Sequence, residues 1–214
     1  MGVLNSLIFY SGVVPYVASG DPFEEICQAM KYLYLKGLIT ALGGNASVKL
    51  DETKIAITPS GKTKFMLTPE DISVVSLNGR HLAGPKPSVE TEMHIGIYLS
   101  CPNCGSVVHI HGLLSPVLAG LLSPVEDLEL KTVGVRICYV DELPPGSKEL
   151  AGAVSSAVAG GCKAVILKNH GIVGIGKNLG EALEVVEAVE NSFKKSLVLY
   201  ILNILGERGL HLLR

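Results

Sequence analysis

The sequence predicts an α/β protein in which helices cover both faces of a mixed central β-sheet. Short apolar, β-branched segments are too numerous for a simple hairpin, and in the second half of the chain they alternate with helical segments. The chain has 214 residues, of which 48% are hydrophobic, which is enough to bury a substantial core. We expect residues 21–214 to form one domain, preceded by an apolar N-terminal arm over residues 1–20.

The first half of the chain predicts one helix followed by several strands. Asp21 can cap the helix, Pro22 and two glutamates fit its first turn, and Gly37 should end it. Asn78 and Gly79 form a strong hairpin turn. Strands are expected over residues 46–50, 54–58 and 72–77, with a turn or a single helical turn over residues 68–71.

The second half of the chain predicts helices and strands in alternation. Four helical and four strand segments can be placed by their apolar periodicity and their end signals. The helices are expected over residues 88–101, 115–122, 147–158 and 178–205, and the strands over residues 106–111, 135–139, 164–167 and 172–175.

Composition and charge exclude several classes of partner. The net charge is −2 and the isoelectric point is near 6.3, so the chain lacks the basic surface of a nucleic-acid-binding protein. The longest apolar run, residues 197–205, is much shorter than the roughly 20 residues that span a membrane. The first 19 residues contain no lysine or arginine, which argues against a signal peptide. The mean hydropathy of +0.40 suggests apolar surface buried between subunits.

Cysteine usage favours a cytoplasmic protein. The chain has five cysteines, an odd number that does not indicate a disulfide scaffold at this length. Cys101 and Cys104 form a CPNC motif with no second pair beside it. We favour free thiols at a helix end over a disulfide or a metal site.

Three histidines are candidate metal ligands. His109 and His111 lie two residues apart in a predicted strand, so their side chains share one face of the sheet. Ordinary hydrogen bonds could also satisfy such a pair. His170 follows another strand and precedes a glycine, at a sheet edge where ligands commonly bind. Three neutral imidazoles suit a catalytic zinc with one open position.

Glu90 is the candidate acid or base beside that zinc. Ser88 can cap a helix whose first turn contains Glu90, and His94 lies four residues further on the same face. The alternative is a solvated acidic residue of the kind that is common in first turns.

Two glycine-containing segments could bind an anion. The segments GGNAS, residues 43–47, and TPSG, residues 58–61, combine backbone N–H groups with small polar side chains. Tight turns use the same residues, so each segment alone is also explained as a turn. No Walker motif and no GxGxxG motif is present, so nucleotide binding is not supported.

Taken together, the motifs resemble the zinc-dependent class II aldolase/adducin-head family. They occur in the order GNxS, TPSG, PSxE, HxH and a late HG. The resemblance covers residues 21–205. Glu90 precedes His109 by 19 residues, and His111 precedes His170 by 59 residues, as in that family.

The resemblance implies a three-layer α/β/α sandwich with a mixed sheet and a specific site. His109, His111 and His170 would bind one zinc ion per subunit, and Glu90 would be the catalytic acid/base, with a pKa that burial can raise and the nearby zinc lowers. The phosphate ligands would be Asn45, Thr58, Ser60, Gly61 and Ser88. The implied reaction is reversible cleavage of a ketose 1-phosphate into dihydroxyacetone phosphate and a small aldehyde. The implied assembly is a homotetramer with active sites at subunit boundaries.

Some positions depart from the family pattern and leave alternatives open. Val89 replaces a serine of the family's aldolases, Leu130 stands at a tyrosine position, and GERGLHLLR at the C-terminus contains no tyrosine. The general acid is therefore not identified. Alternatives within the family are a methylthioribulose-1-phosphate dehydratase and a pentulose-phosphate 4-epimerase, although the epimerases carry aspartate at the Glu90 position. A non-enzymatic adducin-head-like interaction domain and a cupin jelly roll are further alternatives.

Overall fold

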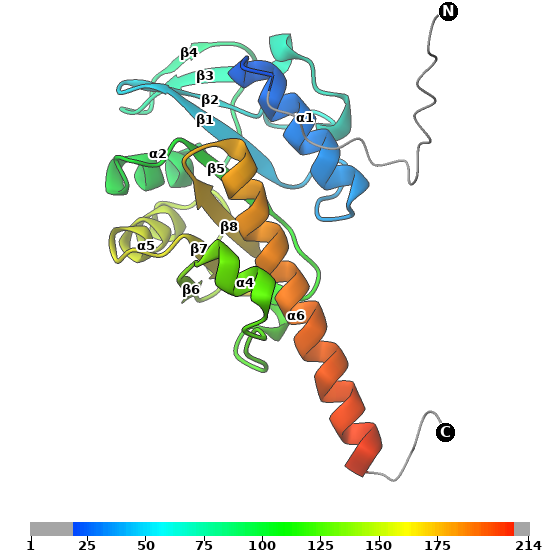
Figure 1. Ribbon diagram of the computed structural model, residues 1–214. Coiled ribbons are helices and arrows are strands. Elements are labelled where there is room, and N and C mark those ends of the chain that lie inside the picture. Colours follow the sequence, from blue (N-terminus) through cyan, green and yellow to red (C-terminus); the bar gives the residue numbers. More distant parts are fainter. Residues whose placement is uncertain (1–18, 208–214) are drawn as a thin grey trace, which may run out of the picture.

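The computed structural model describes residues 19–207, and the predicted arm lies almost entirely outside this range. Eight strands form one sheet in the order β4-β3-β2-β1-β5-β8-β7-β6 (Figure 1). Among these strands β6 and β7 pair in parallel and the other neighbours are antiparallel, which confirms the predicted mixed sheet. The strands are β1 (Asn45–Asp51), β2 (Lys54–Ile57), β3 (Ser73–Ser76), β4 (His81–Ala83), β5 (Ser106–Ile110), β6 (Ile137–Val140), β7 (Ala164–Leu167) and β8 (Gly171–Gly176).

Helices cover both faces of this sheet, as predicted (Figure 1). Successive strand residues serve opposite cores: Val108 and Ile172 pack on one side, and Val107 and Val173 on the other. The first side is covered by α1 (Pro22–Leu35), α3 (Ser115–Leu118), α4 (Leu128–Val133) and α6 (Leu179–Glu207), and the second by α2 (Thr91–Ser100) and α5 (Lys148–Ala159). Two short 3-10 turns, Lys64–Met66 and Pro69–Asp71, lie between β2 and β3.

Two helix boundaries differ from the sequence prediction by three or more residues. α2 begins at Thr91 because Glu90 occupies the N-cap position with a non-helical backbone. α3 ends at Leu118, four residues earlier than predicted. Glu90 therefore precedes the first helical turn, and its side chain does not cap α2.

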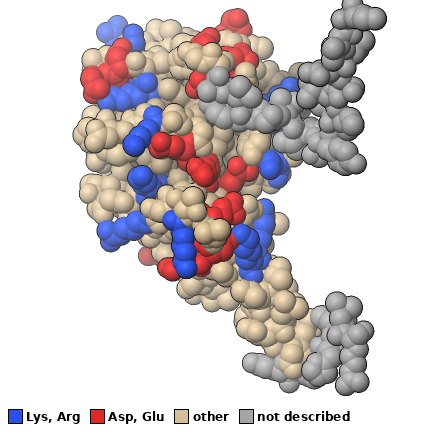
Figure 2. Space-filling model, in the orientation of Figure 1, with Lys and Arg blue, Asp and Glu red and all other residues tan. Residues whose placement is uncertain are grey.

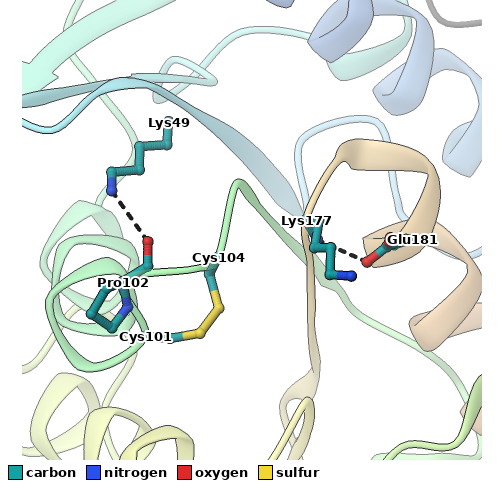
Figure 3. The surroundings of a disulfide bond; sticks show 6 residues. All are labelled: Lys49, Cys101, Pro102, Cys104, Lys177 and Glu181. Carbon is teal, nitrogen blue, oxygen red and sulfur yellow. Dashed lines mark hydrogen bonds between the residues drawn. A yellow bond between two sulfur atoms is a disulfide. The ribbon is translucent and has the colours of Figure 1, made fainter.

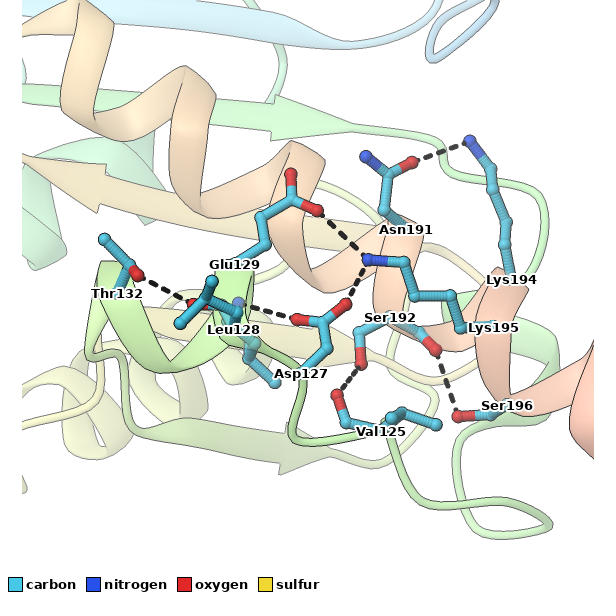
Figure 4. A network of polar contacts seen from close by, with 11 residues as sticks. Val125, Asp127, Leu128, Glu129, Thr132, Asn191, Ser192, Lys194, Lys195 and Ser196 are labelled. Atoms are coloured by element: carbon cyan, nitrogen blue, oxygen red, sulfur yellow. Dashed lines mark hydrogen bonds and ion pairs between the residues drawn. The ribbon is translucent and has the colours of Figure 1, made fainter.

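A helix of six residues, α4, was not predicted from the sequence. Asp127 caps it by accepting from the Leu130 N–H at 2.8 Å, and Gly134 ends it with a φ of 60°. Lys195 on α6 pairs with Asp127 and Glu129, so α4 is tied to α6 by charge as well as by packing (Figure 4). Leu130, which stands at the tyrosine position of the family that the motifs resemble, is buried in this helix.

The prediction of free thiols was wrong. Cys101 is bonded to Cys104 just after α2 (Figure 3). Cys138 in β6 is bonded to Cys162 in the turn before β7. Cys27 is a buried free thiol. The pairing of Cys138 with Cys162 depends on the β6–β7 register, which spacing in the sequence does not reveal.

The last part of α6 extends away from the body of the molecule (Figure 1). Its surface there is largely uncharged, whereas acidic and basic side chains are intermixed over the rest of the face in Figure 2. No helix within residues 19–207 is long and apolar enough to cross a membrane.

Candidate metal centre

Four of the predicted site residues converge at one edge of the central strands. Glu90 begins α2, His109 lies in β5, His111 follows β5 directly, and His170 lies in the turn between β7 and β8. One ligand atom from each of these residues lies within 4.8 Å of the corresponding atoms of the others. Glu90 and His109 are buried, His170 is partly buried and His111 is exposed, so the cluster has one side open to solvent.

The distances in this cluster fit a small tetrahedral metal ion. The Nε2 atoms of His109 and His170 are 3.3 Å apart. Glu90 Oε2 is 3.3 Å from His109 Nε2, and Glu90 Oε1 is 3.4 Å from His170 Nε2. Ligands about 2.0–2.1 Å from a tetrahedral zinc ion are separated by about 3.3 Å, which is close to the spacing of these three pairs of atoms.

The protonation of the cluster also suits a metal. His109 Nδ1 donates to the carbonyl oxygen of Ile172 at 3.0 Å, which leaves Nε2 with its lone pair. Burial lowers the pKa of His109 to about 3 and also lowers that of His111, so both rings are neutral at pH 7. Glu90 Oε1 is buried and has no hydrogen-bond partner among the described residues. A cation beside Oε1 would satisfy it.

The pKa of Glu90 is lowered, not raised as the sequence analysis suggested. Burial opposes ionisation, but the adjacent His109 ring and a hydrogen bond from the Asn45 amide outweigh it and hold the pKa below its ordinary value. Glu90 is therefore an ionised carboxylate at neutral pH. This state allows it to bind a metal ion or accept a proton.

Glycines make room for two of the imidazole rings. A Cβ at Gly43 would lie 2.7 Å from His111 Nδ1, and one at Gly171 would lie 2.7 Å from His109 Cε1. From the sequence, Gly43 was predicted only as part of a candidate anion-binding segment, residues 43–47. The structure gives it a second role, which is to leave space for His111.

Replacing Gly43 with alanine should therefore weaken metal binding. The added Cβ must displace His111, and loss of ligand orientation costs about 10–100-fold in metal affinity. Competition with a chromogenic chelator measures the zinc affinity of the variant and of the wild type. Gly152→Ala in α5 is the matched control because its Cβ would meet nothing within 4 Å, and zinc affinity should not change there. Equal affinities for both variants would contradict the role of Gly43.

A buried glutamate on α6 supports the turn that follows His111. Glu190 accepts hydrogen bonds from the Leu114 N–H at 2.9 Å, the Ser115 N–H at 3.1 Å and the Ser115 hydroxyl at 2.7 Å. Gly112 leaves space for this carboxylate, since a Cβ there would lie 2.6 Å from Glu190 Oε2. The role of Glu190 was not predicted, although a single acidic residue on the apolar face of a helix could have indicated it.

A cavity of about 250 Å³ lies beside the cluster and includes most of the predicted phosphate residues. Ser60, Gly61 and Ser88 line it together with His170. Thr58 does not line it, because its buried hydroxyl accepts from the Ala46 N–H at 3.3 Å. Val89, at the position of the family serine, lines the cavity and is 62% exposed.

Two further polar residues line this cavity, Asn45 and Lys64. Asn45 lines it, but its amide is hydrogen-bonded to Glu90 and His94. Lys64, which the sequence analysis missed, lines it as a buried side chain whose Nζ donates to the Pro59 carbonyl at 2.7 Å. Burial lowers the pKa of Lys64. A buried lysine with further N–H donors beside a polar cavity favours an anionic ligand.

Comparison with known proteins places this site in a family. Residues 24–197 match the Class II Aldolase and Adducin N-terminal domain. An L-fuculose phosphate aldolase of Methanococcus maripaludis strain C5 is 37% identical over 191 residues, which cover 86% of this chain and 97% of that protein. A solved structure of an L-fuculose 1-phosphate aldolase has 32% identity and a TM-score of 0.74, covering 87% of this chain and 90% of its own.

Other relatives carry names for different reactions. A 3-oxo-tetronate 4-phosphate decarboxylase of Haemophilus influenzae is 33% identical, over 80% of this chain and 84% of that protein. A methylthioribulose-1-phosphate dehydratase of Methylococcus capsulatus (Bath) is 36% identical, over 79% of this chain and 89% of that protein. The resemblance inferred from the sequence motifs is thus confirmed. This chain belongs to the class II aldolase and adducin N-terminal domain family, as an enzyme of the class II aldolase superfamily.

Proposed function

We propose that this enzyme is a zinc-dependent aldolase that reversibly cleaves a ketose 1-phosphate into dihydroxyacetone phosphate and a small aldehyde. The observation that carries the proposal is the buried Glu90 carboxylate, which has one unpartnered oxygen beside three histidine side chains. The similarity to L-fuculose phosphate aldolases over most of the chain supports the same reaction.

The metal ligands, Glu90 and the cavity residues have separate roles in the proposed reaction. His109, His111 and His170 would hold one zinc ion, and as a Lewis acid it would stabilise the negative charge left when the carbon–carbon bond breaks. Glu90 removes a proton from the hydroxymethyl carbon of dihydroxyacetone phosphate in the condensation direction and returns it during cleavage. Ser60, Gly61, Ser88 and Lys64 receive the phosphate in the adjacent cavity.

The test is a product analysis with zinc-loaded protein. L-fuculose 1-phosphate should yield dihydroxyacetone phosphate, detected by coupled NADH oxidation, together with an aldehyde identified by mass spectrometry. Loss of water from methylthioribulose 1-phosphate would instead identify a dehydratase, and release of CO₂ from 3-oxo-tetronate 4-phosphate would identify a decarboxylase. Epimerisation of a pentulose phosphate without cleavage would identify the 4-epimerase alternative. Any of these three outcomes without cleavage would contradict the aldolase proposal.

Lys64 should contribute to phosphate binding. Replacing it with methionine keeps the alkyl chain but removes a charged donor from the cavity, and hydrogen bonds to charged groups contribute roughly 1.5–3 kcal/mol. We expect KM for a phosphorylated substrate to rise about tenfold or more, with a smaller change in kcat. Lys62→Met is the control, since Lys62 is partly exposed and pairs with Asp71. An unchanged KM in Lys64→Met would remove Lys64 from the phosphate site.

We also propose a cytoplasmic homotetramer with active sites at subunit boundaries. Five consecutive large apolar residues of α6, Val198, Leu199, Tyr200, Ile201 and Leu202, are each about half exposed where this helix leaves the body. Light scattering should give four times the chain mass of 22.6 kDa, and Leu199→Glu should give smaller species. A monomeric wild-type protein would contradict this assembly.

A further inference from the structure

We propose that His94 is a positioning residue that fixes the Asn45 amide so that its N–H group, and not its oxygen, faces Glu90. The inference rests on the proposed function only through the role of Glu90. It concerns a row of buried polar side chains between β1 and α2, which we call the polar seam. The seam consists of Asn45, Ser47, Glu90, His94 and Tyr98.

The local structure brings these five side chains together. Asn45 and Ser47 alternate along β1 and therefore point to the same face of the sheet. Glu90, His94 and Tyr98 follow one another at intervals of four and line one side of α2. All five are at most 5% exposed, in a region where apolar packing would normally join a helix to a sheet.

Hydrogen bonds connect the seam from end to end. The Asn45 Nδ2 donates to Glu90 Oε2 at 2.8 Å, and Asn45 Oδ1 lies 2.5 Å from His94 Nε2. His94 Nδ1 lies 2.7 Å from the hydroxyl of Ser47. The hydroxyl of Tyr98 lies 2.9 Å from that of Ser47 and 3.0 Å from its carbonyl oxygen.

The chemistry of these groups fixes which atom donates and which accepts in each hydrogen bond of the polar seam. Asn45 presents its NH₂ group to Glu90 Oε2 and its oxygen to His94 Nε2, and an amide oxygen can only accept. His94 must then carry its proton on Nε2. Burial lowers the pKa of His94 to about 4, so the ring is neutral and Nδ1 is bare. Ser47 therefore donates to Nδ1, and Tyr98 donates to Ser47.

The opposite tautomer of His94 would reverse the effect on Glu90. A bare Nε2 would attract the Asn45 NH₂ group, and the amide oxygen would turn toward the carboxylate. Two acceptors would then face each other in a buried site, which costs free energy. The tautomer of a ring that touches neither the candidate metal ligands nor the cavity thus determines how Glu90 is held.

The first test reads the tautomer directly and does not depend on catalysis. Long-range ¹H–¹⁵N NMR of histidine-labelled protein should show His94 with Nε2 protonated and Nδ1 unprotonated, and the signals are assigned by their loss in His94→Gln. An Nδ1-protonated ring or an imidazolium at neutral pH would overturn the proposal. This result holds even if the enzyme catalyses a reaction other than aldol cleavage.

The second test uses a matched pair of variants. The amide nitrogen of glutamine is as many bonds from the backbone as Nε2, so His94→Gln keeps a donor for Asn45. The amide nitrogen of asparagine corresponds to Nδ1, so His94→Asn loses this donor. Zinc affinity should stay near the wild-type value in His94→Gln and fall about 10–100-fold in His94→Asn, because Glu90 loses its orientation.

The control is the same pair of substitutions at His81, an exposed residue on β4, where neither should affect zinc affinity. Thermal unfolding of the metal-free proteins separates a folding defect from a positioning defect. If both His94 variants fold and lose zinc affinity equally, the donor to Asn45 is not the cause and the proposal fails. If neither variant loses affinity, it fails as well.

Discussion

Replacing Glu90 with glutamine is expected to lower turnover by about 10²–10⁴-fold, the range of a general acid–base contribution, while zinc stays bound to the three histidines. Glutamine has nearly the same shape as glutamate and can still accept the hydrogen bond from Asn45. It cannot take up a proton in the pH range of activity. The loss should therefore appear in kcat, and KM should change little.

The matched control for this variant is Glu92→Gln. Glu92 lies two residues away on the same helix, but it is exposed and lies outside the histidine cluster. Zinc content, kcat and KM should match the wild type in this control. Full activity in Glu90→Gln with one zinc per chain would remove Glu90 from the chemistry and leave it only a structural role in the polar seam.

The sequence predicted the parts of the site that depend on local order. His109 and His111 converge because β5 continues to Ile110 and alternation puts both rings on one face. His170 joins them because β8 pairs antiparallel with β5, so the turn before β8 lies beside the C-terminal end of β5. Strand alternation and the positions of strand ends are readable from a sequence, so these histidines could be named as candidates before the pairing of β5 with β8 was known.

Features that depend on contacts between distant segments were missed. Lys64 looks like a surface lysine in the sequence and becomes buried only when its turn packs beside the cavity. Glu190 reaches Ser115 across 75 positions of the chain. Cys138 meets Cys162 only through the pairing of β6 with β7. In each case the local residue types allow several structures, and tertiary packing decides among them.

The placement of Asn45 shows why a motif alone did not give the role of its side chain. GNxS predicted an anion-binding residue, and the backbone of this segment does border the cavity. The strand register, however, turns the Asn45 side chain toward α2, where Glu90 and His94 use both ends of its amide. The second Nδ2–H of Asn45 is not used by either contact, so a phosphate contact from Asn45 stays a prediction.

Replacing His170 with alanine is expected to remove most of the bound zinc from protein purified without added metal. Two histidines and Glu90 would remain, and the loss of a direct ligand should cost more than the about 10–100-fold that an outer-shell partner contributes. Zinc also stabilises the folded chain in proportion to the logarithm of its concentration over Kd, so the rise in Tm on adding zinc should shrink.

His81→Ala is the control for this variant, because His81 is an exposed histidine on β4 outside the cluster. It should keep one zinc per chain by elemental analysis, as should the wild type. Full zinc in His170→Ala would show that the metal binds elsewhere. No zinc in the wild type, even after zinc is supplied, would overturn the metalloenzyme proposal, and a non-catalytic interaction domain would then explain the fold better. Because the three outcomes differ in metal content alone, they can be told apart before any substrate is known.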